Sequence, residues 1–255
     1  MSIAVESMFD KELNDLNTQN KEDMQEYLNK VRAILAIYVI TGSYKNIDES
    51  IKGLSDNTIG NISNRSLKSI NNMYTKAFNM TEEDINEILD EPLYSNNNVD
   101  EVMNEKIAGK TIGERFTLLK GVTAASVLLG IKKDVSKTFA EADKILKARV
   151  ESIGTNIETI NITKGHRVVE QGKRDKVLDV IAKKNNFKAT KEWNSQDDSL
   201  VRQAHNILHK NTIGVDDNFY SPAGGVGYGP GLMGNSGDDI RCRCYLVYNY
   251  QKGDN

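Results

Sequence analysis

The sequence predicts an α+β protein: a mostly helical N-terminal region followed by a small C-terminal α+β module with a short antiparallel sheet. Apolar residues recur every three or four positions through most of the first 160 residues, which is the period of a helix. Only three prolines occur in 255 residues, so long helices can form. After about residue 160 the pattern changes to short segments, alternating stretches and a glycine-rich loop.

Residues 1–105 are expected to form an acidic helical region. One helical face from about residue 20 to 40 is marked by Met24, Leu28, Val31, Leu35 and Tyr38, with Gly42 closing the helix. Shorter helices are expected over residues 43–80. A new helix is expected to start at Thr81, because a capping hydroxyl precedes three carboxylates. The polar stretch 94–98 predicts a linker or exposed loop.

Residues 106–160 are expected to be helical, with a turn at Gly130–Ser136. Residues 161–255 predict a small α+β module. Its expected elements are a short helix at Val177–Ile181, a strand at Lys188–Trp193, a helix at Ser199–His209, a glycine-rich loop at Phe219–Gly237 and a strand at Ile240–Tyr248.

No apolar run approaches the roughly 20 residues that span a bilayer. The two best candidates, Ala33–Ile40 and Val122–Ile131, predict buried helix instead. The N-terminus lacks a basic segment followed by an apolar one, so we expect no signal peptide, no membrane anchor and synthesis in a cytoplasm.

The net charge of −3 hides an asymmetry along the chain. Residues 1–105 have a net charge of −10 and residues 106–255 a net charge of +7. Within the basic part, Lys173, Arg174, Lys183 and Lys184 are expected to contact double-stranded DNA through its phosphates, without sequence specificity and in a salt-sensitive way. The alternative is a plain solvated surface.

The two cysteines, Cys242 and Cys244, are separated by one residue in the last predicted strand. Positions i and i+2 of a strand share a face, so both thiols should project together, and a disulfide between them would close a strained ring. With His205 and His209, four apart on a predicted helix, they could form a Cys2His2 structural zinc site. The alternative is two buried thiols without metal, and no cofactor is required.

Two other features have simpler interpretations. The glycines of residues 224–231 are not followed by a helix, so they do not form a dinucleotide loop. They are expected to pack closely against another backbone, or to stay mobile until a partner orders them. The acid pairs are expected at solvated turns and helix caps, because adjacent carboxylates point apart: Asp197–Asp198, Asp216–Asp217 and Asp238–Asp239.

A series of short motifs follows a fixed order over roughly residues 106–248. It begins at Lys110-Thr111-Ile112-Gly113-Glu114-Arg115, continues through Ala148-Arg149-Val150-Glu151 and Lys191-Glu192-Trp193, and closes at Cys242-Arg243-Cys244. This succession resembles the phage head-morphogenesis family of Mu F-like minor head proteins, in which a threonine is usual at the position of Val150. The residues to which the resemblance assigns a structural role in the family motifs are Arg149, Glu151, Trp193, Arg202, His205, Phe219, Pro230, Cys242 and Cys244.

The resemblance implies a minor capsid protein of a tailed bacteriophage. Such a protein acts in head assembly and in DNA packaging or ejection. Its implied partners are the portal protein and the major capsid or scaffolding protein, and its implied place is the virion, inside the head near the portal vertex. The charge asymmetry would suit an arrangement in which residues 1–105 bind the portal or capsid protein and the basic part faces DNA.

Two other classes remain open. The first is an effector enzyme that transfers ADP-ribose or hydrolyses with a metal. We expect no enzyme, because no nucleophile, base and oxyanion stabiliser can be assembled, and because the chain ends at Asn255, soon after the motifs. The second is a non-specific DNA-binding protein, which a steep loss of DNA affinity with salt would indicate.

Overall fold

The structure, a computed structural model, describes residues 3–41, 47–89, 92–95, 97–107, 109–133, 139–196 and 198–252. These residues form two compact units, each assembled from separate stretches of the chain. A helical unit takes residues 14–68 and 112–160, and an α+β unit takes residues 1–13, 69–111 and 161–255. The boundaries of these units differ from the predicted boundaries at residues 105 and 160, because the long helices contribute to both units.

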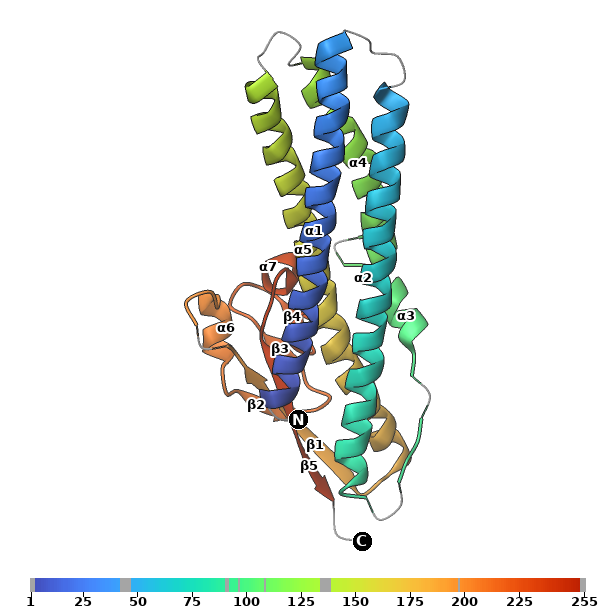
Figure 1. Ribbon diagram of the computed structural model, residues 1–255. Helices are drawn as coiled ribbons and strands as arrows, with labels where there is room; N and C mark the ends of the chain where they lie inside the picture. The colour runs from blue at the N-terminus through green and yellow to red at the C-terminus, as the bar shows by residue number, and fades with distance from the viewer. Residues whose placement is uncertain are drawn as a thin grey trace. The chain divides into compact units, whose positions relative to one another are not determined.

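The helical unit contains parts of α1 (Ile3–Thr41), α2 (Ile47–Asn86) and α5 (Phe139–Lys183), together with α4 (Ile112–Lys133) (Figure 1). Its core side chains are fully buried, among them Val31, Ile51, Ile59 and Val127. The Arg32 guanidinium donates two hydrogen bonds to the Asp143 carboxylate. Burial of an apolar stripe from each helix holds the unit together.

Two helices are longer than the sequence indicates. The short helices expected between residues 43 and 80 are one helix, α2, and Thr81 lies inside it rather than at its start. The buried Thr81 hydroxyl donates to the carbonyl of Ala77 at 2.8 Å, which satisfies it within the helix. The stretch Val177–Ile181 is likewise part of α5.

Two expected helix ends include residues outside the described part of the chain. Gly42 lies outside the described residues, as does the 134–138 part of the predicted turn, although α4 does run on to Lys133.

The α+β unit confirms the predicted fold class. Its antiparallel sheet has the order β2 (Thr212–Gly214), β1 (Phe187–Asn194), β5 (Tyr245–Lys252). The unit also contains a two-stranded ribbon, β3 (Phe219–Tyr220) with β4 (Val226–Gly227), and three short helices, α3 (Val99–Asn104), α6 (Gln203–Leu208) and α7 (Ser236–Asp239). Figure 1 shows the strands beside the second half of α5.

The predicted last strand begins later than expected. β5 starts at Tyr245, so Cys242 and Cys244 lie in the loop between α7 and β5 rather than in the strand. The predicted helix at 199–209 is also shorter, because α6 spans only Gln203–Leu208.

A buried ion pair from α5 covers the outer edge of β5. Lys173 Nζ lies 2.7 Å from Glu170 Oε1, and both residues are almost completely buried. Glu170 Oε2 accepts from the backbone N–H of Leu246 at 3.2 Å, and Lys173 donates to the carbonyl of Leu246 at 3.4 Å. Since β5 is the edge of the sheet, this pair satisfies backbone groups that no neighbouring strand reaches.

Within the described residues, no helix combines the length and apolar composition needed to cross a membrane. The two apolar runs are only partly buried, contrary to expectation. Ile37 and Ile40 of α1 are exposed, as are Val122 and Leu129 of α4. Each run lies on an amphipathic helix of the bundle, where one face packs and the other is open.

Candidate metal centre

Three side chains predicted to share a site converge in the α+β unit. Nδ1 of His205 lies 3.6 Å from Sγ of Cys242 and 3.5 Å from Sγ of Cys244. The three ligand atoms all lie within 4.8 Å of one another, and all three residues are buried. Both cysteines are free thiols. Two sulfurs and one imidazole nitrogen are the donor types that zinc prefers.

Backbone turns bring the thiols to the histidine. His205 comes from α6, and the two cysteines follow α7 directly. Between α7 and Cys242, Arg241 adopts a left-handed φ of 55°, which reverses the chain. The amide of Cys242 then donates to the carbonyl of Asp239 at 3.3 Å. Arg202, just before α6, donates to the carbonyl of Ile240 and so ties the two segments together.

A buried carboxylate orients the imidazole. Asp238 is fully buried, and its Oδ1 lies 3.1 Å from Nε2 of His205. The same oxygen accepts from the hydroxyl of Ser221 at 2.8 Å, and Oδ2 accepts from the amide of Gly225 at 3.1 Å. Because an ionised carboxylate can only accept, Nε2 carries the proton, and the lone pair of Nδ1 points toward the two sulfurs.

The glycine-rich loop is shaped around this carboxylate. A Cβ at Gly225 would lie 2.3 Å from Oδ2 of Asp238, and a Cβ at Gly227 would lie 2.0 Å from the carbonyl oxygen of Leu232. The prediction that this loop packs closely against another backbone is therefore confirmed. The expectation of a solvated turn is wrong for Asp238 and Asp239, because both side chains are buried and accept hydrogen bonds from backbone amides.

Aromatic side chains form one wall of the centre. The indole of Trp193, on β1, meets the imidazole of His205 edge-on, with ring centroids 5.3 Å apart. It meets Phe219 in the same way at 5.2 Å. Trp193 is completely buried, and Pro230 is also buried. Trp193 and Phe219 thus give His205 an apolar aromatic neighbourhood.

The electrostatics of the three donors are coupled. The hydrogen bond that the Cys242 thiol donates to Cys244, together with burial, raises the pKa of Cys242 well above its ordinary value. Accepting that hydrogen bond lowers the pKa of Cys244, in spite of burial. Burial opposes protonation of His205, but its hydrogen bonds with Cys242 and Asp238 outweigh that effect and raise its pKa. The thiol of Cys244 is therefore easier to deprotonate than the thiol of Cys242.

Other residues of the predicted site lie elsewhere. His209 is exposed, and its Nδ1 accepts from the amide of Ser195 at 3.1 Å, so it is not part of the three-residue group. Arg149 and Glu151 belong to the helical unit. There Arg149 donates to the hydroxyl of Ser126 at 2.9 Å, while Glu151 is exposed.

The DNA-contact prediction needs correction for Lys173. Its side chain is completely buried in the ion pair that covers β5, so it cannot reach a phosphate. The guanidinium of Arg174 is half-buried over the ring of Tyr228, 4.5 Å from its centroid. Lys183 is exposed and pairs with Asp179, and Lys184 is half-buried.

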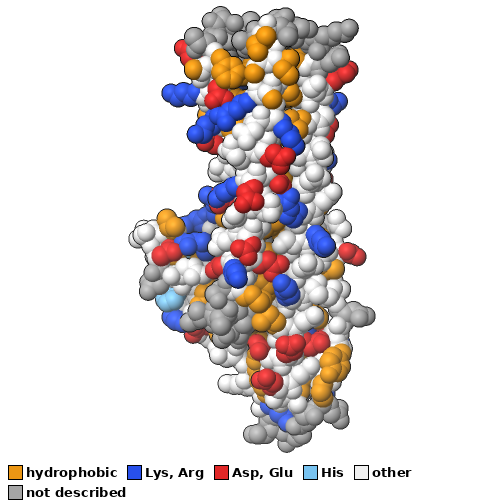
Figure 2. Space-filling model, viewed as in Figure 1, with side chains coloured by type: hydrophobic (Ala, Val, Ile, Leu, Met, Phe, Trp, Pro, Cys, Tyr) orange, Lys and Arg blue, Asp and Glu red, His pale blue; other side chains and the backbone are white. Residues whose placement is uncertain are grey.

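Other basic side chains of the α+β unit also hold it together instead of facing solvent. Arg167 donates two hydrogen bonds to Glu105 and one to the carbonyl of Gly231. Lys176 bonds the Glu82 carboxylate and the carbonyl of Leu93. On the face seen in Figure 2, basic and acidic side chains are interspersed.

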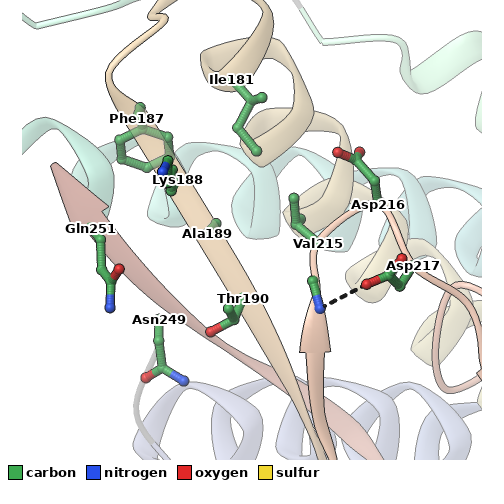
Figure 3. A pocket seen from close by; sticks show the side chains of 11 residues that line it. Ile181, Phe187, Lys188, Ala189, Thr190, Val215, Asp216, Asp217, Asn249 and Gln251 are labelled. Carbon is green, nitrogen blue, oxygen red and sulfur yellow. Dashed lines mark hydrogen bonds between the residues drawn. The ribbon is translucent and has the colours of Figure 1, made fainter. Parts of the chain in front are cut away.

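A groove of about 410 Å³ lies beside β1 and the end of β2 (Figure 3). Asp216 and Asp217 both line it, but their carboxylates diverge. Asp217 turns back to accept from the amide of Gly214 at 3.2 Å. This agrees with the expectation that adjacent carboxylates point apart.

Comparison with known proteins identifies the domain that contains the centre. Residues 131–247 match the family described as Phage Mu protein F like protein. These residues form a domain similar to the Mu F-like family. All three donors of the centre, and Asp238, lie inside the matched residues of this domain.

A curated relative supports the same family. Minor head protein GP7 of Bacillus phage SPP1 is 42% identical over 86 residues, which are 34% of this chain and 27% of that protein. The chain therefore matches only about a quarter of the length of this relative. No solved structure matches the chain significantly.

No sequence pattern in this Mu F-like domain indicated that Asp238 and its hydrogen-bond partners belong to the centre. Asp238 was visible only as half of an acid pair, and neither Ser221 nor Gly225 carried a signal for the centre. The spacing of 33 residues between His205 and Asp238 follows no short motif. Only the paths of the glycine-rich loop and α7 bring these groups together.

Proposed function

We propose that the chain is a structural component of a tailed-phage head, present at the portal vertex and acting in head assembly, with no catalytic role. The observation that carries the proposal is the match of residues 131–247 to the Mu F-like family, together with 42% identity to a phage minor head protein. Burial of His205, Cys242 and Cys244 supports a structural role, because a substrate from solvent would not reach them.

Exposed apolar side chains on α4 suit a protein partner. Leu118, Val122 and Leu129 are about half-exposed and lie four and seven residues apart, on one helical face. Such a row tends to mark a surface that another protein covers. In this proposal the portal protein covers it, so the partner surface is not confined to residues 1–105.

The test is co-purification of the full chain with the portal protein of the same phage. The variant Leu118→Glu/Val122→Glu should bind the portal at least tenfold more weakly. Lys30→Glu, at an exposed position of α1 in the same unit, should bind like the wild type. Deleting residues 1–105 would be uninformative, because both compact units contain residues from that range.

Purified virions provide the second test. Proteomics of intact heads should detect the chain in few copies, and absence from the head would overturn the proposal. Direct DNA contact is proposed only for Lys183 and Lys184 at the end of α5. With two phosphate contacts, any DNA affinity should be low and should fall only about tenfold between about 50 and 200 mM salt. A steep fall would instead favour a DNA-binding protein.

A further inference from the structure

We infer that His205, Cys242 and Cys244 bind a zinc ion that ties α6 to the segment before β5. The first support is geometric. With Zn–S bonds of about 2.3 Å and a Zn–N bond of about 2.0–2.1 Å, tetrahedral ligands place sulfur and nitrogen roughly 3.6 Å apart. The distances from His205 Nδ1 to the two sulfurs are 3.6 and 3.5 Å. Both nitrogen–sulfur distances therefore match those expected between the ligands of a tetrahedral zinc ion.

The direction of the imidazole lone pair is the second support. Asp238 holds the proton on Nε2, so Nδ1 has one lone pair, which faces both sulfurs at nearly equal distance. A single lone pair can accept one S–H hydrogen bond well, but not two. A metal ion between the three atoms accounts for both contacts together.

The third support is the shell around the donors. Histidines that bind metals almost always donate their other ring N–H to a carboxylate or carbonyl, which fixes the ring. Asp238 does this for His205, and it is itself held by Ser221 and Gly225. These groups are buried, so the imidazole is positioned before any ion arrives.

The donor set selects zinc over the common hard cations. Magnesium and calcium take oxygen ligands, whereas two thiolates and one imidazole suit zinc. Among the described residues the group supplies three protein ligands, which leaves one position of the tetrahedron to a water molecule. The ion would join residues 37 and 39 positions apart and enclose the glycine-rich loop between them.

The test is the zinc content and zinc affinity of the purified full chain under reducing conditions. The wild type should hold about one zinc per chain. His205→Ala, Cys242→Ser and Cys244→Ser should each lower zinc affinity at least a hundredfold. The matched control, His209→Ala, should match the wild type within twofold. Asp238→Asn should still bind one zinc at saturation, but about 10- to 100-fold more weakly.

A second measurement on the wild type keeps the test decisive if variants fail to fold. After zinc is removed with a chelator, returning zinc should slow alkylation of both thiols at least tenfold, and magnesium should not. The inference is overturned if the reduced wild type binds no zinc, or if zinc leaves alkylation unchanged. It is equally overturned if His209→Ala loses zinc as completely as His205→Ala.

Discussion

The buried ion pair of α5 makes a quantitative prediction about the stability of the α+β unit. In Lys173→Met, the carboxylate of Glu170 stays buried and loses the ammonium group that lies 2.7 Å from Oε1. Breaking a buried pair by removing one partner costs about 3–5 kcal/mol. Methionine nearly fills the volume of the lysine stem, so packing adds little to this cost.

The size of the loss matters because domains are marginally stable. A loss of this size is a large part of the roughly 5–15 kcal/mol that stabilises a typical domain. Urea unfolding followed by fluorescence reports on the right unit, since Trp193 is the one tryptophan and is buried beside Leu246 in the sheet. The midpoint should therefore fall sharply in Lys173→Met.

Two further variants separate charge burial from other effects. Lys183→Met removes an exposed i,i+4 pair with Asp179 on the same helix and should cost less than about 1 kcal/mol. Glu170→Met combined with Lys173→Met should recover part of the loss, because no charge remains buried. It should not recover all of it, because the backbone groups of Leu246 lose their partners. A cost for Lys173→Met no larger than for Lys183→Met would refute the reasoning.

Three other changes test separate features. Burial lowers the pKa of Lys191, which lies over the ring of Tyr228, to about 7. Between pH 7 and about 10.5 the unfolded chain therefore binds the extra proton, and stability should rise with pH by up to about 1.4 kcal/mol per unit. In pH-dependent urea unfolding, Lys191→Met should be more stable by about 1–4 kcal/mol at pH 7 and should show a shallower slope, and an unchanged slope would contradict the assignment. Lys164, whose pKa burial lowers to about 8, should supply the slope that remains. Gly225→Ala should cost about 1–3 kcal/mol in thermal unfolding, because its Cβ meets the carboxylate of Asp238, and a neutral result would show that the loop can shift. Gly53→Ala, with open space around its Cβ in α2, should stabilise by about 1 kcal/mol, and a loss of stability would contradict the helical packing there.

Much of the architecture could be predicted from the sequence, because it depends on local periodicity. The α+β class and the strand around Trp193 follow from apolar spacing and alternation. Helix boundaries were less predictable. Thr81 reads as a helix start, but its burial and the hydrogen bond from its hydroxyl to the carbonyl of Ala77 keep it inside α2.

What the sequence determined by itself was the likeness to the Mu F-like family and the candidate group of His205, Cys242 and Cys244, because motif order and residue type are properties of the chain. The tertiary structure decided which groups meet. It set His209 apart, brought Asp238 to the imidazole, and buried Lys173, which the sequence predicted to contact DNA. The physical reason is that burial and pairing depend on contacts between residues far apart in the chain, which no local pattern encodes.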